Sequence, residues 1–437
     1  MFEASAQHRS AAPNAHAGAG PEASARLLDV NFGLFVHYVP ELTVDSSGRV
    51  ASLAQLVEEF DVDAFVRDLV KFGVEYVRFT AWHQGMHPLY PSAVMKRRRG
   101  NSSHSERDLI AEIIRALAGT GISLQLYTHP RDGHDMNRVD QDLTGWGNSA
   151  PPGDPNPDPR TFNFETWNEF ICEVYSELVA RYGRDVETIY LDEGSERADS
   201  EWVVDYPRLR ETIRAGAPNI LVQQNYYGSL YTADLADHEY CHWGELTLAD
   251  ADLWPAYRTR SVSAVVGDLW YASNPGPSSS ISYKPRDFFR YLVLQTSANL
   301  SGGGLALAAG PFADNGWEPG VQGFLEAVGS MVAPVRRSII GTRPSSRWPT
   351  MDRATIASLT WGGVATEDPQ RTYLHILRPP ADSVIRLPRS SDGSVPRTVR
   401  LLLEGIKLET VQVDGATHIT VLPELWDEID TVLELTF

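Results

Sequence analysis

The sequence predicts an α/β fold, a (β/α)8-like TIM barrel followed by a C-terminal all-β sandwich domain. Short apolar runs rich in β-branched and aromatic residues alternate with helical stretches over most of the 437 residues. This alternation is typical of a parallel sheet whose strands are connected by helices. Past about Arg343 the helical stretches stop, and short strands separated by Gly, Pro, Asp and Ser follow.

The first four predicted strands each lead to an ionisable side chain. Ligands of parallel α/β folds bind at the C-terminal ends of the strands, so these side chains are expected to meet where an enzyme carries its chemistry. The strands span residues 32–36, 74–81, 122–127 and 188–191, and they lead to His37, His83, His129 and Asp192.

Helices with apolar residues at helical spacing separate the strands. Gly73 follows the first helix and Gly119 the second, as expected where a helix ends. The polar, Pro-rich stretch from Pro130 to Pro159 is predicted to be an active-site loop. The predicted helices are residues 62–71, 108–117, 164–182, 207–215, 288–299 and 321–335, and the further barrel strands are residues 220–225, 262–270 and 305–310.

Three regions are expected along the chain: a flexible tail over residues 1–26, the barrel over residues 27–343 and the β-sandwich over residues 344–437. The sandwich holds no cluster of chemical residues, so it is expected to brace the barrel. The tail lacks the basic start and apolar stretch of a secretory signal, and we therefore expect a cytoplasmic protein. The predicted sandwich strands are residues 372–377, 383–387, 399–403 and 431–435.

The composition argues against nucleic acid or an anionic membrane as a partner, because the formal charge is −19. The basic run Lys96–Arg99 is expected in a loop after a strand, as a solvated face rather than a phosphate site. Cys172 and Cys241 are too few for a disulfide framework and lack metal-site spacing. No apolar run reaches the length of a membrane span.

A carboxylate beside histidines at strand ends permits three chemistries. Metal-assisted hydrolysis is disfavoured because no strand carries a His-x-His pair, so neither a metal nor another cofactor is expected. Acid/base work on a carbonyl or amine stays open. Glycoside cleavage needs two carboxyl groups and polar and aromatic side chains that grip a sugar. Aromatic residues near the strand ends fit that need: Tyr38, Trp82, Tyr90, Tyr127, Trp146, Trp243, Trp254, Trp270 and Tyr271.

Several stretches after the tail, among them Phe32–Tyr38, Thr80–Gly85 and Tyr190–Gly194, match the ordered motifs of one enzyme family. Through them the chain resembles the α-L-fucosidases, glycoside hydrolase family 29, over nearly its whole length after the tail. Phe32–Tyr38 resembles the family's first-strand signature, and Tyr190–Gly194 is similar to its Trp-Phe-Asp-Gly segment. Thr80–Gly85 looks like the start of its Thr-Ala-Lys-His-His-Asp-Gly-Phe segment. Further similar stretches are residues 60–63, 89–92, 107–109, 122–127, 303–311, 314–316, 338–344 and 401–405.

The resemblance implies roles for residues that match the family's motifs. Asp192 is the implied nucleophile, and His37 and His83 match histidines that grip the sugar. Tyr127 and His129 lie where the family's third strand lines the sugar site. From the residues alone, Asp192 could instead cap a helix or join an ion pair, and the histidines could be hydrogen-bonded without touching a ligand.

The sequence also departs from the family's pattern after the second strand. The family's paired histidines are His83 and Gln84 here, and Trp82 stands where the family has Lys. The following Asp-Gly-Phe is Gly85–His87. Trp82, Gln84 and Trp270 are nevertheless expected to contact the substrate.

The general acid is expected to be Glu239 or Glu245. Taken alone, Glu239 or Glu245 is more readily an exposed loop residue, and Glu193, Glu196 and Asp268 are alternatives for the acid. A retaining mechanism would place the acid and the nucleophile about 5–5.5 Å apart.

The predicted function is a retaining exo-glycosidase that acts on an α-L-fucoside or a related deoxysugar glycoside. The expected substrate is a small-molecule glycoside or glycosylated metabolite. Two alternatives stay open: a barrel that binds a glycan or metabolite without cleaving it, and non-hydrolytic acid/base chemistry with the same carboxylates.

Overall fold

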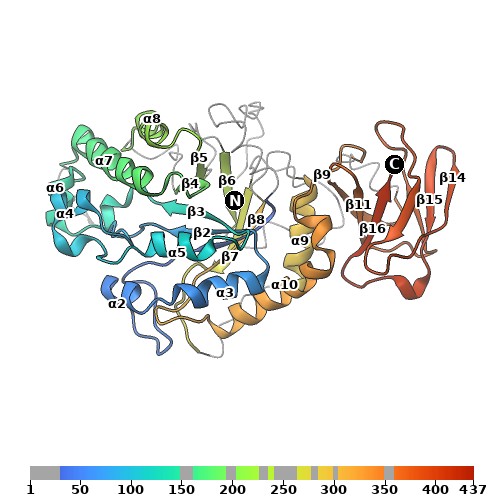
Figure 1. The fold of residues 1–437 in the computed structure, drawn as a ribbon, viewed down its shortest axis with the longest axis horizontal. Coiled ribbons are helices and arrows are strands. Elements are labelled where there is room, and N and C mark those ends of the chain that lie inside the picture. The colour runs from blue at the N-terminus through green and yellow to red at the C-terminus, as the bar shows by residue number, and fades with distance from the viewer. Residues whose placement is uncertain are drawn as a thin grey trace, which may run out of the picture.

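Eight parallel strands form a closed barrel in chain order, β1 to β8 (Figure 1). The computed structural model describes residues 30–147, 161–192, 203–225, 235–240, 263–276, 284–298, 304–348 and 359–437, with residues 235–240 and 263–269 as backbone. Closure is visible at Gly33, which pairs with Tyr76 of β2 on one side and Ala306 of β8 on the other. The strands are β1 (Phe32–Val36), β2 (Tyr76–Thr80), β3 (Ser123–Thr128), β4 (Thr188–Leu191), β5 (Leu221–Asn225), β6 (Leu235–Tyr240), β7 (Ser263–Leu269) and β8 (Leu305–Ala309).

The helices around the barrel begin and end where local chemistry dictates. In α3 the side chain of Asp61 accepts the amide hydrogen of Ala64, and Gly73 ends the helix with φ 74°. Both positions leave fewer terminal backbone groups unpaired. The helices are α2 (Leu53–Glu58), α3 (Val62–Phe72), α4 (Ala93–Arg99), α5 (Leu109–Leu117), α6 (Arg138–Thr144), α7 (Phe164–Tyr182), α8 (Tyr206–Gly216), α9 (Pro285–Ala298) and α10 (Pro319–Ile339).

A buried arginine occupies the interior of the barrel below the strand ends. The Arg78 guanidinium on β2 lies 4.2 Å from the Tyr190 ring centroid and 1% of the residue is exposed. It donates to the side-chain oxygens of Gln125 and Gln223 on β3 and β5. Amide oxygens and an aromatic face replace part of the water that this charge loses on burial.

Two antiparallel sheets follow the barrel, and the five-stranded one packs against α9 and α10 (Figure 1). Thr366 of β10 donates to the Ser338 carbonyl in α10 at 2.6 Å, and Arg290 of α9 donates to the Leu377 carbonyl at 3.0 Å. The sheets have the orders β13-β16-β11-β10-β9 and β12-β15-β14. Their strands are β9 (Arg343–Pro344), β10 (Gly362–Glu367), β11 (Thr372–Arg378), β12 (Val384–Leu387), β13 (Thr398–Leu401), β14 (Thr410–Val413), β15 (Ala416–Thr420) and β16 (Thr431–Thr436).

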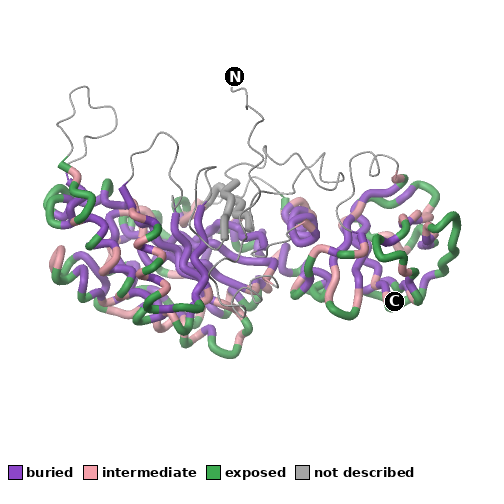
Figure 2. Tube along the Cα trace, turned by 90° about the horizontal axis from the view of Figure 1, so that it is seen from above, coloured by how far each residue is buried: buried purple, intermediate pink, exposed green. Residues whose placement is uncertain are grey.

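The predicted fold class, a barrel followed by an all-β domain, is confirmed. The domain bounds stay a prediction, and β9 spans the expected boundary between residues 343 and 344. Buried residues fill the centre of the barrel and the space between the C-terminal sheets (Figure 2). Among the described residues, no helix has both the length and the apolar character needed to cross a bilayer.

Three local predictions were wrong. Strand β6 was missed, because its sequence Leu-Ala-Asp-His-Glu-Tyr lacks the apolar run of the other strands. The expected loop from Pro130 holds a 3-10 helix over Asp132–Asp135 and the helix α6. The basic run Lys96–Arg99 ends helix α4 instead of forming a loop, and Arg99 donates to Asp140 and to two carbonyl groups.

Gly33 gives a test of the barrel's packing. A β-carbon there would lie 2.1 Å from the Tyr76 ring, so Gly33→Ala is expected to destabilise the fold by about 1–3 kcal/mol or more. The control is Gly323→Ala in α10, where nothing lies within 4 Å of the added carbon. That change is expected to stabilise by about 0.5–1 kcal/mol. Thermal unfolding of the two variants measures both effects, and equal midpoints would contradict the prediction.

Candidate active site

Three histidines and one carboxylate gather at the C-terminal ends of the first four strands. His37 directly follows β1, His129 follows β3 and Asp192 follows β4. His83 lies in the turn after β2, and its ring centroid is 5.2 Å from that of His37 and 5.2 Å from that of His129. Adjacent parallel strands therefore deliver four ionisable groups to one small region.

Asp192 is held by side chains from both neighbouring strands. The Tyr127 hydroxyl of β3 donates to Oδ2 at 2.5 Å, and Asn225 Nδ2 at the end of β5 donates to Oδ1 at 2.8 Å. Burial alone would raise the pKa of this carboxyl group. His129 and the bonds from Asn225 and Tyr127 nevertheless keep the pKa of Asp192 below its ordinary value. A buried carboxylate that stays ionised is suited to act as a nucleophile.

His37 is buried and neutral. Burial lowers its pKa to about 3, and the neighbouring His83 contributes in the same direction. The His37 ring packs against Tyr127 at 4.6 Å and against Trp270 at 5.3 Å between centroids. Its buried Nε2 atom has no hydrogen-bond partner among the described residues. Such an atom is available for a ligand hydroxyl group.

His83 has the opposite character. Its Nδ1 lies 2.8 Å from Oδ2 of Asp132, which follows β3 in the 3-10 helix. Burial would lower the pKa of His83, but the charge of Asp132 and the hydrogen bond to it raise it above the ordinary value. Burial would likewise raise the pKa of Asp132, and His129 and His83 hold it below its ordinary value.

The remaining predicted residues occupy different positions. Trp82 is fully buried, donates through Nε1 to the His129 carbonyl and packs edge-on against Tyr175 at 5.0 Å, so it supports the loop. Gln84 is partly exposed beside His83. Trp270 packs edge-on against Phe35 and accepts the His37 amide hydrogen through its carbonyl group.

For the candidate general acids, the structure describes less than for the other predicted site residues. Glu239 lies near the end of β6, of which the backbone is described. Asp268 lies in β7 and is described in the same way. Glu245, Glu193 and Glu196 lie outside the described residues.

Sequence reasoning missed two residues of this region. Asp132 was included in the expected loop, although an acid three residues after a strand-end histidine is a usable signal. Asn225 was read as the last residue of a strand, and its partner is 33 residues away. The sequence predicts no metal, yet ligand atoms of His83, His129 and Asp132 lie within 4.8 Å of one another, as a metal site would require.

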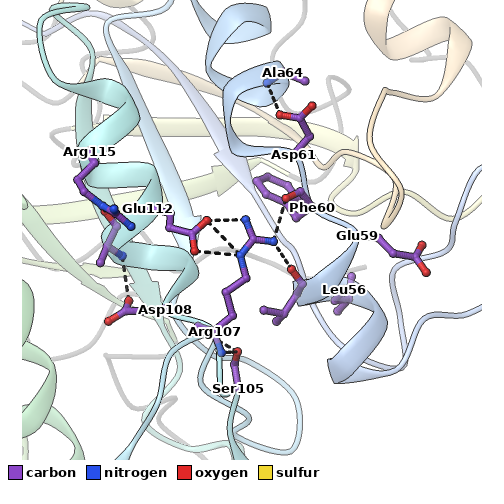
Figure 3. A network of polar contacts seen from close by, with 12 residues as sticks. Leu56, Glu59, Phe60, Asp61, Ala64, Ser105, Arg107, Asp108, Glu112 and Arg115 are labelled. Carbon is purple, nitrogen blue, oxygen red and sulfur yellow. Dashed lines mark hydrogen bonds and ion pairs between the residues drawn. The ribbon is translucent and has the colours of Figure 1, made fainter.

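A depression of about 580 Å³ lies elsewhere, between α3 and α5, and Figure 3 shows the network of polar contacts around its residue Arg107. Arg107 is its central residue, and it pairs with Glu112 and donates to the carbonyl group of Phe60. This network ties the chain after α2 to the start of α5. The guanidinium donors of Arg107 bond to Glu112 and to backbone carbonyl groups, so we assign Arg107 a structural role.

The closed barrel, with its histidines and ionised carboxylate at the strand ends, defines a TIM-barrel glycoside hydrolase. A sequence model described as α-L-fucosidase matches residues 54–331. The chain belongs to the α-L-fucosidase family, so the predicted resemblance and class of enzyme are confirmed. Among curated proteins, none matches the sequence significantly.

Solved structures share the fold at low sequence identity. α-L-Fucosidase isoenzyme 1 from Paenibacillus thiaminolyticus is 19% identical with a TM-score of 0.66, and the match covers 95% of this chain and 99% of that one. The enzyme from Vibrio sp. strain EJY3 is 19% identical with a TM-score of 0.70, over 97% and 74% of the chains. A Bacteroides thetaiotaomicron α-L-fucosidase, trapped as a covalent intermediate with 2-fluoro-fucosyl fluoride, is 14% identical with a TM-score of 0.66, over 95% and 96%.

Tyr127→Phe tests how Asp192 is kept ionised. Losing the hydroxyl bond removes a stabilising contact of the charged carboxylate, so the pKa of Asp192 is expected to rise. The acid limb of kcat/KM should then move to higher pH by about one unit. The pH profile of aryl glycoside hydrolysis measures the change.

The matched control is Tyr175→Phe, whose hydroxyl donates to Thr128 at 2.7 Å rather than to Asp192. Its acid limb is expected to coincide with that of the wild type. Equal profiles for the wild type and Tyr127→Phe would show that the hydroxyl does not set the charge of Asp192.

Proposed function

We propose that the protein is a retaining exo-glycosidase that cleaves an α-L-fucoside or a related deoxysugar glycoside by double displacement. The observation that carries the proposal is Asp192, a buried carboxylate at the end of β4 with a lowered pKa and one side-chain donor on each oxygen. Two of its donors are the side chains of Tyr127 and Asn225, which come from the neighbouring strands β3 and β5.

The chemistry follows from this carboxylate. Asp192 attacks the anomeric carbon while a second carboxyl group protonates the leaving oxygen, which breaks the glycosidic bond. The first product is a glycosyl group esterified to Asp192. Water, deprotonated by the same second carboxyl group, then releases the sugar with its original anomeric configuration. A covalent intermediate trapped in the Bacteroides thetaiotaomicron α-L-fucosidase supports this course.

His37 and His83 supply polar contacts for sugar hydroxyl groups. The unpartnered Nε2 of His37 and the ring of His83, whose pKa Asp132 raises against the effect of burial, follow the adjacent strands β1 and β2. Trp270, packed against His37, adds an aromatic surface of the kind that holds sugar rings. We propose that these residues bind the sugar of a small glycoside or glycosylated metabolite. The cytoplasmic location stays a prediction.

Glu239 is the better-supported candidate for the general acid. Asn225, whose side chain contacts Asp192, pairs in register with Asp237 of β6. Glu239 lies two residues further along β6, so it has the same strand parity as Asp237. The β4 and β6 backbones are about 10 Å apart across β5, a separation compatible with the 5–5.5 Å between carboxyl groups that retention requires. Glu245 stays an alternative.

Asp192→Gly with azide tests the nucleophile. Hydrolysis of an aryl α-L-fucoside, measured beside other aryl deoxyglycosides, is expected to fall by at least about 10³-fold. Azide should restore turnover and give a fucosyl azide of inverted configuration, because it attacks the substrate directly. The exposed Asp142→Asn is the matched control and should keep wild-type rates. No turnover of any glycoside by folded wild type would refute the proposed function.

Glu239→Gln and Glu245→Gln together identify the acid. The variant that lacks the acid should lose at least about 10²-fold in rate on a fucoside with a poor leaving group. Its kcat/KM on a dinitrophenyl fucoside should stay near that of the wild type, because the first step then needs no protonation, whereas its kcat should fall because the second step still needs the base. Azide should then give a product of retained configuration, since it attacks the covalent intermediate. If neither variant shows this dependence on the leaving group, both candidates are wrong.

A further inference from the structure

Asp132 lies between two of the imidazole rings of the candidate active site. It is fully buried, its Oδ2 lies 2.8 Å from His83 Nδ1 and its Oδ1 lies 3.0 Å from His129 Nδ1. The two rings are stacked, with centroids 5.2 Å apart and planes 16° from parallel. A carboxylate bonded to Nδ1 fixes the orientation of an imidazole and leaves Nε2 to face a ligand.

His37 and His83 are neighbours whose pKa values shift in opposite directions. Their ring centroids are 5.2 Å apart, yet burial lowers the pKa of His37 to about 3, whereas Asp132 raises the pKa of His83 against the effect of burial. Two charged rings at this distance would repel each other. The charged and titratable groups around His83 come from β1, β3, the 3-10 helix and the end of β4: His37, Tyr127, His129, Asp132, Asp135 and Asp192.

We propose that Asp132 is a positioning residue that keeps His83 charged and oriented, so that His83 and the neutral His37 form a donor and acceptor pair for one sugar hydroxyl group. The proposal rests on the proposed function. His83 donates from Nε2 to the hydroxyl oxygen, and the same hydroxyl group donates its hydrogen to the unprotonated ring nitrogen of His37. This pairing selects a hydroxyl group over a carbonyl or ether oxygen, because only a hydroxyl group can both accept and donate.

Asp132 also influences the ionisation of Asp192, through His83. His83 Nδ1 lies 2.8 Å from Asp132 Oδ2, and interaction with His83 lowers the pKa of both Asp132 and Asp192. Removing the charge of Asp132 would release the His83 proton, and Asp192 would lose one of the cations that keep it ionised. Asp132 thus acts on the reacting carboxylate through His83.

The decisive measurement is an NMR titration of the histidine Cε1–H groups, with His83 assigned by its loss in His83→Gln. In the wild type, His83 is expected to titrate above pH 6.5 while His37 stays neutral through pH 5. In Asp132→Asn, which keeps the shape and an acceptor oxygen, the His83 midpoint should fall by one pH unit or more. The His375 resonance in the C-terminal sheet, where His375 pairs with Asp430, should not move.

A wild-type His83 that titrates below pH 6.5, or one unchanged in Asp132→Asn, would overturn the proposal. The wild-type measurement stands even if Asp132→Asn does not fold. Neither NMR titration requires the enzyme to turn over a substrate. Failure of the proposed function would therefore be seen separately, as an absence of hydrolysis by the wild type. Asp135→Asn is the matched control in the same helix, since that carboxylate is half exposed and contributes less to His83. It should shift His83 less than Asp132→Asn does.

Kinetics and a metal titration complete the test. Asp132→Asn is expected to lose 10- to 100-fold in kcat/KM on an aryl fucoside, and the double variant with His83→Gln should be no worse than His83→Gln alone. Additive losses would mean that Asp132 does not act through His83. The geometry also resembles a zinc site, so zinc is titrated by calorimetry. Saturable zinc binding that Asp132→Asn abolishes would replace the positioning role with metal coordination, whereas none is expected.

Discussion

The active-site region depends on keeping one carboxylate, Asp192, ionised while it is buried. Removing a carboxylate from water costs several kcal/mol unless donors and positive charges compensate. The compensation comes from Tyr127 on one neighbouring strand and Asn225 on the other, with His129 and His83 nearby. Both donors are correctly spaced only when β3, β4 and β5 pair in register, so barrel closure and the charge of Asp192 are linked.

The need to compensate buried charge also applies to the side chains around Asp192. The pKa values of Asp192 and Asp132 are lowered, that of His83 is raised, and burial lowers that of His37 to about 3. Inside the barrel, the buried cation Arg78 is held by glutamine oxygens and an aromatic ring. Such pKa shifts favour opposite charges on neighbouring groups, which lowers the cost of burying several of them together.

Much of the fold could be predicted because hydrophobic periodicity is local. Helix α7 matches its predicted bounds, and seven of the eight barrel strands were identified. Strand β6 was missed because its acidic sequence is stabilised by its neighbours in the barrel rather than by its own apolar residues. Strand ends likewise indicated His37 and Asp192, whereas the roles of Asp132 and Asn225 depend on contacts between segments that only the folded chain brings together.

One residue after β2 that departs from the family's pattern, Trp82, contacts the loop after β3 that carries Asp132. Trp82 stands where the family has Lys, and its ring is buried against Tyr175 while its indole nitrogen donates to the His129 carbonyl. Where the family has a charged side chain, Trp82 thus supports the loop after β3. That loop carries Asp132, which lies beside His83. A negative charge beside His83 is therefore supplied by Asp132 from the loop after the neighbouring strand β3.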